Sequence, residues 1–318
     1  MDELYKVDNG AGWRISLKRV APAPSAAGAK RPALIVPGYG MNSFIFGFHP
    51  RGLSLEGYLA SRGIEVWSVD LRGQGRAERR GGTDRFELAE MMDDVDVAVR
   101  HVLSHTKTGA GQVDLIGCSL GTALMFGYVA HQPQAPVRCL VNVGGLVTWV
   151  KIHPALRVAF HYPWLVGGLR IRHTRKMAGV ALPVLARYAP KLLSVYMNVS
   201  STDVTEAATM VQTVEDPNPH VNRNIAHWVA ERELVMRGVN VSRALRGMHH
   251  PFLCIVANDD GIVPPETARD PYDAIGSDDK ELLAVGDPTF PMAHADLFLS
   301  TGCQEKVFEK LAAFLLAR

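Results

Sequence analysis

Short apolar runs recur along the chain, and stretches with helical periodicity follow most of them. The runs cover residues 33–37, 64–70, 113–117, 137–145, 251–257 and 281–285. A continuous apolar run of this length is typical of a strand that is covered on both faces of a sheet. Residues 12–20 instead alternate apolar and polar side chains, which predicts an edge strand or a half-exposed one.

Helical periodicity separates these predicted strands. The predicted helices cover residues 53–63, 86–107, 119–131 and 265–275, and a final helix lies within 303–318. In the longest of them, apolar side chains such as Met92, Val95 and Val99 recur at steps of three and four residues, as on the buried face of a helix. Strands that alternate with helices predict right-handed β-α-β units and a mainly parallel sheet with helices on both faces.

This alternation stops at about residue 146 and resumes at residue 251. The segment between contains helix-like pieces rich in Leu, Val, Met and Trp, and no clear run of strand formers. A connection of about a hundred residues is too long for a loop, so it should fold as a unit of its own. We therefore predict an α/β core made of residues 1–145 and 251–318, with a helical cap (146–250) inserted between two late strands.

Composition narrows the class of protein. Of the 318 residues, 47% are apolar, and the formal net charge is +2. Such a chain can bury a substantial core, and its near-neutral charge gives no reason to expect nucleic acid or an anionic membrane surface as the main partner. We see no signal peptide and no apolar stretch of about 18 residues that could span a membrane. We therefore expect a reduced, soluble, cytoplasmic protein.

Candidate chemistry lies where the predicted strand 113–117 meets the helix 119–131. The sequence there is Gly117-Cys118-Ser119-Leu120-Gly121. Gly-x-Ser-x-Gly in that context is typical of a nucleophile elbow, a sharp turn that exposes one side chain at the start of a helix. Because Ser119 is centred between the glycines, we predict that it is the nucleophile and that Cys118 packs into the fold.

A serine nucleophile near neutral pH needs a base to take its proton. Ligands of open α/β sheets bind beyond the carboxyl ends of the strands, so the base should follow a strand directly. Of the twelve histidines, His294 meets this condition, because it follows the strand 281–285. His227 and His49 remain alternatives as residues that line the pocket.

An acid must orient the imidazole and stabilise its protonated form. Asp259 and Asp260 both follow the strand 251–257 directly. We favour Asp260, which sits at the turn before Ile262-Val263-Pro264, while Asp259 would cap that turn. The chain order Ser119, Asp260, His294 is the order expected for this type of elbow.

Two backbone N–H groups should stabilise the oxyanion of a tetrahedral intermediate. One is the N–H of Leu120, directly after the nucleophile. We nominate the N–H of Tyr39 as the other, because the loop Pro37-Gly38-Tyr39-Gly40 follows the strand 33–37 and its glycines allow close approach. The alternative is a glycine turn with an exposed tyrosine.

These segments together resemble the α/β-hydrolase superfamily, over residues 30–145 and 250–318. The sequence VDLRGQG (69–75) is similar to a structural turn of that superfamily. The stretch PGYGMNSFIFGFHPRGLSLEGYLASRGIEVWSVDLRG (37–73) also resembles acid lipases and polyhydroxyalkanoate synthases. Two features differ: the oxyanion loop has Pro37-Gly38 where His-Gly is usual, and Ser119 stands where the synthases have cysteine, which favours hydrolysis over polymerisation.

We therefore expect a serine hydrolase of carboxylic esters, of the esterase or lipase type. The apolar side chains of the predicted cap suggest a substrate with an apolar acyl group, of medium length or longer. Acyl transfer, or a polyhydroxyalkanoate synthase-like or depolymerase-like reaction, is the main alternative. A catalytically silent binding protein with this fold is the less favoured one. Epoxide and haloalkane hydrolysis need a carboxylate at the elbow, where this chain has Ser119.

We expect neither a metal nor an organic cofactor. The four cysteines are widely spaced, and the pair His249-His250 has no partner at ligand spacing. No glycine-rich loop of the phosphate-binding or dinucleotide-binding type follows a predicted strand. A small-molecule ester is the expected partner.

Overall fold

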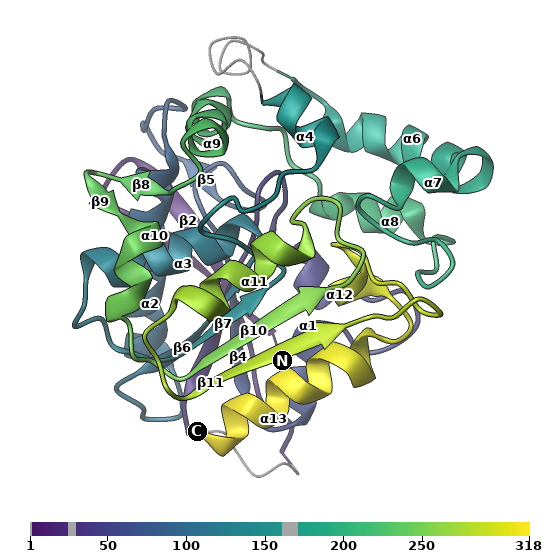
Figure 1. The fold of residues 1–318 in the computed structure, drawn as a ribbon. Coiled ribbons are helices and arrows are strands. Elements are labelled where there is room, and N and C mark those ends of the chain that lie inside the picture. Colours follow the sequence, from purple (N-terminus) through teal and green to yellow (C-terminus); the bar gives the residue numbers. More distant parts are fainter. Residues whose placement is uncertain (1, 25–29, 161–170) are drawn as a thin grey trace.

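A nine-stranded sheet forms the centre of the computed structural model, which describes residues 2–24, 30–160 and 171–318 (Figure 1). Its strands are β1 (Asp2–Asp8), β2 (Trp13–Val20), β3 (Pro32–Val36), β4 (Glu65–Asp70), β5 (Glu78–Arg79), β6 (Val113–Cys118), β7 (Val137–Val143), β10 (Phe252–Ala257) and β11 (Lys280–Val285). The order is β1-β2-β4-β3-β6-β7-β10-β11, with β5 beside β2. All pairs from β4 to β11 are parallel, while β1, β2 and β5 pair antiparallel.

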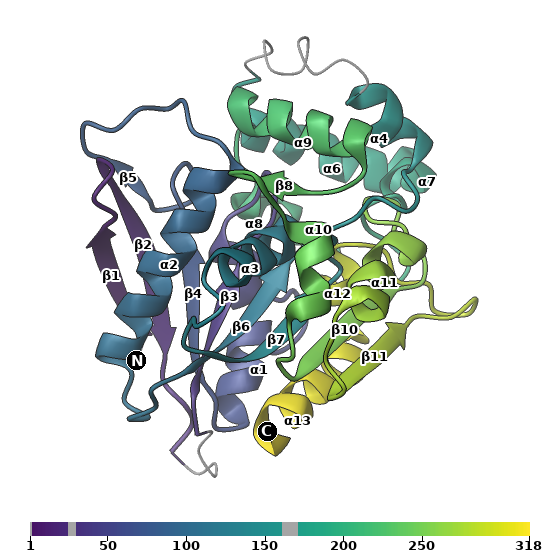
Figure 2. The same ribbon diagram turned by 60° about the vertical axis from the view of Figure 1, so that its left-hand side comes forward.

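Helices cover both faces of this sheet (Figure 2). One layer holds α2 (Leu88–His105), α3 (Leu120–His131), α10 (Val241–Ala244) and α11 (Pro265–Ala274), and the other holds α1 (Leu55–Ser61), α12 (Asp296–Leu299) and α13 (Glu309–Ala317). Alternate side chains of a strand point to opposite faces. In β6, Leu115 therefore joins the apolar cluster under the first layer, and Ile116 joins the cluster under the second.

The predicted α/β architecture is confirmed, and the differences lie at its edge. The sequence analysis assigned no strand to residues 2–8, which form β1 and pair with β2 along its whole length. Exposed and half-buried side chains alternate along β1. The sequence of such an edge strand contains few apolar residues, because only one face of the strand packs against the protein and that face is only half-buried.

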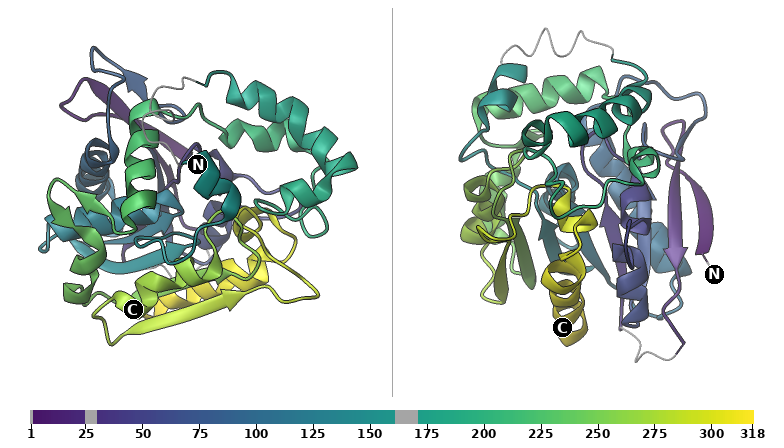
Figure 3. Two further views of the ribbon diagram at one scale, coloured as in Figure 1. Left: turned by 45° about the horizontal axis from the view of Figure 1, so that its top comes forward. Right: turned by 90° about the vertical axis from the view of Figure 1, so that its right-hand side faces the viewer.

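The segment between β7 and β10 is mostly helical and lies over the carboxyl ends of the parallel strands (Figure 3). Its helices are α4 (Pro154–Ala159), α6 (Thr174–Tyr188), α7 (Pro190–Leu193), α8 (Ala207–Met210) and α9 (Pro219–Glu231), and a small hairpin joins β8 (Val235–Met236) to β9 (Val239–Asn240). Just before β10, α10 (Val241–Ala244) packs against α3. We use "cap" below for the helices α4 to α9.

None of the helices in the described ranges is both long enough and apolar enough to cross a membrane.

Candidate active site

Ser119 occupies a strained turn between β6 and α3. Its φ is 54° and its ψ is −122°, a conformation that side-chain-bearing residues rarely adopt. The turn fits only because glycines flank it. A Cβ on Gly117 would come within 2.5 Å of the Thr122 Cα, and one on Gly121 within 2.2 Å of the Val36 carbonyl oxygen. The two glycines of the motif thus allow the chain to reverse sharply enough to expose the serine.

Cys118 and Ser119 differ in exposure, although both border the same cavity. The Cys118 side chain is fully buried in the apolar cluster under the second helix layer, and burial raises the pKa of its thiol well above the ordinary value. Ser119 is partly accessible and lines a cavity. In the described part of the chain its hydroxyl has no hydrogen-bond partner, which leaves it available to a ligand.

His294 and Asp260 form a buried pair at the carboxyl end of the sheet. The His294 Nδ1 lies 2.6 Å from the Asp260 Oδ2. The second carboxylate oxygen of Asp260 accepts the backbone N–H groups of Ile262 and Val263, both at 2.8 Å. These bonds fix the carboxylate, which in turn fixes the orientation of the imidazole.

The turn after β7 brings this pair close to the elbow. A Cβ on Gly144 would lie 3.7 Å from both the His294 Cε1 and the Asp260 Oδ2. One on the next residue, Gly145, would lie 2.5 Å from the Ser119 carbonyl oxygen. The backbone N–H of Ser119 also donates to the Val143 carbonyl at 3.1 Å. Ser119 and His294 thus flank the same two-glycine turn, and both line the same cavity.

Two buried residues that the sequence analysis did not single out hold the loops of the site. The Asp296 carboxylate accepts the Ala293 N–H at 2.8 Å and the Thr202 hydroxyl at 2.7 Å, and burial raises its pKa. The Asn142 Oδ1 accepts the Gly145 N–H at 2.8 Å. Asp296 therefore anchors the loop of His294, and Asn142 anchors the turn next to the elbow. Asn142 sits inside a predicted strand and Asp296 in a predicted loop, and only the folded chain reveals their partners.

The alternative site residues of the sequence analysis lie elsewhere. The His49 Nε2 is 3.1 Å from the carbonyl oxygen of Ser300, and His49 does not line the cavity of Ser119. His227 lines a separate pocket. Asp259 is exposed, and it is Asp260, not Asp259, that caps the turn through its carboxylate.

The loop of Tyr39 packs directly against the elbow. A Cβ on Gly38 would come within 2.8 Å of the Ser119 Cβ, so only glycine permits this approach. Gln74, from the turn after β4, donates to the Gly38 carbonyl at 3.0 Å, and the Tyr39 hydroxyl donates to the Asn222 Oδ1. The backbone N–H groups of Tyr39 and Leu120 have no partner in the described ranges, and the first N–H of a helix has none within the helix itself.

A mostly apolar cavity of about 350 Å³ surrounds these groups. Its sheet side contains Ser119, His294 and the Tyr39 loop. The cap contributes the other side, from the loop before α4 to α9: Trp149, Leu156, Phe160, Tyr196, Thr213, Val214, Ile225, Trp228 and Val229. No Asp, Glu, Lys or Arg of the described residues lines it. A volume of this order suits a small organic ligand.

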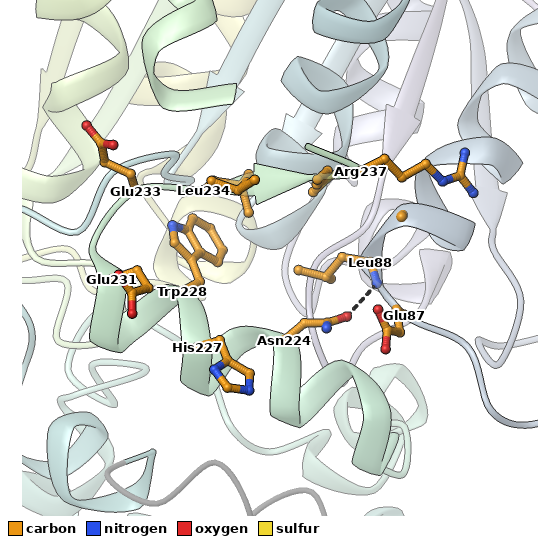
Figure 4. Close-up of a pocket in the computed structure, with 12 residues that line it drawn as sticks. Glu87, Leu88, Asn224, His227, Trp228, Glu231, Glu233, Leu234 and Arg237 are labelled. Carbon is orange, nitrogen blue, oxygen red and sulfur yellow. Dashed lines mark hydrogen bonds between the residues drawn. The ribbon is translucent and has the colours of Figure 1, made fainter. Parts of the chain in front are cut away.

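Trp228 separates this cavity from a smaller pocket of about 170 Å³ between α2, α9 and the β8–β9 hairpin (Figure 4). Trp228 borders both spaces and is 4% exposed. Its indole N–H donates to the Val147 carbonyl at 2.9 Å, which fixes the ring in this position. The smaller pocket has a different character, with Glu87, Glu231 and His227 on its walls.

No cluster of three or more His, Cys, Asp or Glu side chains with metal-binding geometry occurs within 2–24, 30–160 and 171–318.

Comparison with solved structures places the whole chain in one architecture. A serine hydrolase of carbazole degradation, CarC, superposes with a TM-score of 0.65 at 17% identity over 100% of both chains. An esterase from Exiguobacterium antarcticum gives 0.62 at 15% identity, over 98% of this chain and 97% of the other. The haloalkane dehalogenase DbeA from Bradyrhizobium elkani USDA94 gives 0.63 at 16% identity, over 100% and 98%. Similarity at these identities shows a shared fold.

Comparison with curated proteins yields no match. A family model does match: the one described as Serine aminopeptidase, S33 (Hydrolase_4) covers residues 51–285. This range includes the elbow, Asp260 and the entire cap, and it accounts for more than half of the chain. The protein therefore belongs to this family of α/β hydrolases.

Proposed function

We propose that the protein hydrolyses carboxylic esters with an apolar acyl group, through an acyl-enzyme on Ser119. The observation that carries this proposal is the buried His294–Asp260 pair, which shares one apolar cavity with a serine on a strained elbow. A serine, a histidine and an acid are the side chains that a serine hydrolase needs, and backbone N–H groups supply the rest of its chemistry.

In the proposed reaction the Ser119 Oγ attacks the ester carbonyl and the His294 Nε2 takes its proton. Asp260 stabilises the imidazolium that forms, because its Oδ2 accepts a hydrogen bond from the His294 Nδ1–H. The N–H groups of Leu120 and Tyr39 donate to the oxyanion of the tetrahedral intermediate. His294 then protonates the departing alcohol. In the second half of the reaction, His294 activates a water molecule that attacks the acyl-enzyme. This attack releases the carboxylic acid product and restores Ser119.

The cavity lining supports an uncharged, apolar acyl group. Burial of an unpaired charge in such a space is strongly unfavourable, and no acidic or basic side chain of the described residues lies there to pair with one. A substrate of a serine aminopeptidase, the activity after which the matched family is named, carries a charged amine and would need a carboxylate beside it. Dehalogenation, the activity of one structural neighbour, needs a carboxylate at position 119. Both features favour an ester over these substrates.

A fluorophosphonate probe tests the nucleophile. We expect the wild-type chain to be labelled, and Cys118→Ala to be labelled as well, whereas Ser119→Ala stays unlabelled. Ser119→Ala should also reduce ester turnover by about 10⁶-fold, as in serine hydrolases that lose this hydroxyl. Labelling of Ser119→Ala, or loss of labelling in Cys118→Ala with the fold intact, would contradict the assignment.

A series of p-nitrophenyl esters of increasing acyl length tests the substrate class. We expect turnover to peak at medium or longer chains and to be weak with acetate. Repeating the series with an added alcohol or thiol separates the two fates of the acyl-enzyme: water as sole acceptor supports hydrolysis, while formation of a new ester or thioester supports acyl transfer.

A further inference from the structure

Helix α6 exposes apolar side chains along its outer face. Met177, Val180, Val184 and Tyr188 recur at steps of three and four residues, so they form one stripe on the helix. Val180 and Tyr188 are each 73% exposed, and Leu192 on α7 continues the stripe with 70%. Scattered apolar residues on a protein surface are ordinary, but a contiguous row of this kind marks an interaction site.

The opposite face of α6 already has its packing partners. Leu182 packs against the apolar cluster under the second helix layer, and a Cβ on Gly179 would lie 3.7 Å from the Val211 side chain. The outer stripe is therefore not the face that holds α6 in the cap. Figure 1 shows α6 and α7 at the outer edge of the molecule, above α8.

The stretch of chain that contains the stripe carries basic side chains and no acidic ones. No Asp or Glu occurs between Asp114 and Asp203, although the chain contains 32 acidic residues. Lys176, Arg187 and Lys191 flank the stripe, are exposed, and form no ion pair with any described residue.

The acidic groups that approach α6 lie at its beginning. Glu215 pairs with Arg175 at 2.8 Å, and the Asp216 carboxylate accepts the Thr174 N–H at 2.8 Å. They neutralise the start of the helix and leave the three cations along the stripe unpaired. We call Met177, Val180, Val184, Tyr188 and Leu192, together with these three cations, the α6–α7 surface.

We infer that the α6–α7 surface docks the protein on an anionic lipid surface. An amphipathic element that presents apolar side chains between Lys and Arg residues binds at the interface of a membrane, where the apolar groups enter the acyl boundary and the cations meet lipid phosphates. A second copy of this chain fits less well, because a two-fold interface would bring the same cations together. The expected partner is an acidic lipid layer, held peripherally.

This docking would place the cap, and with it the cavity beneath, beside a store of apolar esters. The cap residues between α7 and α9 that line the cavity follow the α6–α7 surface directly in sequence. The inference goes beyond the proposed reaction and does not depend on it, since lipid binding needs none of the groups around Ser119. The inactive Ser119→Ala chain should therefore bind as the wild type does.

Cosedimentation with vesicles tests the inference. We expect the wild-type chain to bind vesicles that mix phosphatidylcholine with phosphatidylglycerol, and to bind pure phosphatidylcholine much more weakly. Raising the salt concentration should weaken binding, because it screens the cations. The variant Lys176→Gln, Arg187→Gln, Lys191→Gln should bind on the order of 100-fold more weakly, about fivefold for each charge removed at the lipid surface.

Matched variants separate the surface from net charge and from folding. Arg14→Gln, Lys107→Gln, Lys310→Gln removes the same charge at exposed positions outside the cap and should leave binding unchanged. Val180→Gln, Val184→Gln keeps the charge and replaces valine with a better helix former, so α6 should persist while binding falls at least tenfold.

Three results would overturn the inference. One is equal binding to both vesicle types. Another is equal loss in the two charge variants. The third is a concentration-dependent dimer, seen by sedimentation velocity, that Val180→Gln, Val184→Gln abolishes while vesicles bind none of the chains; this would assign the surface to a second copy.

Discussion

The sheet side and the cap side of the cavity around Ser119 are built by different interactions. On the sheet side, directional hydrogen bonds fix each polar group: Asp260 holds His294, Asn142 holds the turn at Gly145, and Gln74 holds Gly38. On the cap side, apolar rings and aliphatic chains pack with few side-chain hydrogen bonds, such as those of the Trp228 indole and the Thr213 hydroxyl. For the proposed reaction, the difference separates two properties: the geometry of the sheet side would set the chemistry, and the volume on the cap side would set the acyl group that fits.

Among the residues that support Ser119, the acid on the sheet side should have the largest effect. Asp260→Asn keeps the shape of the side chain but removes the charge that stabilises the imidazolium, and we expect kcat to fall about 10⁴-fold with KM little changed. Asp259→Asn is the matched control at the exposed neighbouring position and should retain wild-type turnover. A greater loss in Asp259→Asn than in Asp260→Asn would show that the pairing of His294 with Asp260 does not govern the reaction.

The next largest effect should come from Gly38→Ala, which tests the close approach of the Tyr39 loop to the elbow. In Gly38→Ala the new Cβ would lie 2.8 Å from the Ser119 Cβ, so the loop must move and take the Tyr39 N–H with it. Loss of one oxyanion donor reduces kcat by about 10²–10³-fold, and we expect a loss of that order in steady-state ester hydrolysis. Gly247→Ala, where a Cβ meets nothing within 4 Å, serves as the control. Wild-type kcat in Gly38→Ala would mean that this loop does not contribute the second donor.

A smaller change, in the selectivity for acyl-chain length, should follow from a substitution on the cap side. Trp228→Ala would join the cavity of about 350 Å³ to the pocket of about 170 Å³ beyond it. We expect kcat/KM for the longest acyl chains to rise about tenfold relative to short ones, because each buried methylene adds about 0.8 kcal/mol until the wall is reached.

Trp149→Ala is the comparison variant, since Trp149 borders the larger space but not the smaller one. It should widen the cavity without lengthening it. Because loss of a large buried side chain costs about 3–5 kcal/mol of stability, melting temperatures and a milder Trp228→Leu variant accompany the assay. Identical chain-length profiles for the Trp228 and Trp149 variants would remove Trp228 as the end wall.

The smallest effect concerns acid stability of the core and leaves the cavity untouched. Burial, helped by the nearby charge of His105, lowers the pKa of His101 to about 4. A pKa lower in the folded state than in the unfolded state means that the unfolded chain takes up the proton first. The contribution of neutral His101 to the free energy of unfolding is therefore complete above about pH 6.5, and it is lost as the pH falls toward 4.

His101→Phe keeps the ring that packs against Tyr5 and Trp67 and cannot be protonated. We expect it to recover roughly 1–2 kcal/mol of unfolding free energy at pH 5, measured by urea denaturation, and to change nothing at pH 8. An equal gain at both pH values would point to packing instead of protonation.

Local sequence patterns predicted the α/β core. They also nominated Ser119, Asp260 and His294, but not Asn142 or Asp296, whose hydrogen bonds anchor the neighbouring loops. The elbow, the base and the acid each follow a strand directly, and the carboxyl ends of parallel strands meet at one edge, so chain order alone predicts that they converge. The hairpin at β8–β9 escaped prediction because Arg237, with a φ of 45°, stands at a turn position where Asn or Asp usually signals a hairpin.

The cap side could not be predicted in the same way. Its helices were recognisable, but the apolar residues that face the cavity have no pattern distinct from those that pack between helices. Contacts between segments far apart in sequence place Trp228 between two cavities. They also bring the Tyr39 hydroxyl to Asn222. The stripe on α6 was not predicted either. The net charge of +2 is an average over the whole chain and does not show that a long interval lacks acidic residues.

The crowding around the elbow has a consequence for how such enzymes diversify. Of the five motif positions, only position 119 is not buried, while an added Cβ on either flanking glycine would lie less than 3 Å from backbone atoms. Evolution can therefore exchange the attacking atom, oxygen for sulfur or carboxylate, more easily than it can alter the frame that presents it. Among the solved structures that share this fold, one is described as an esterase and another as a haloalkane dehalogenase.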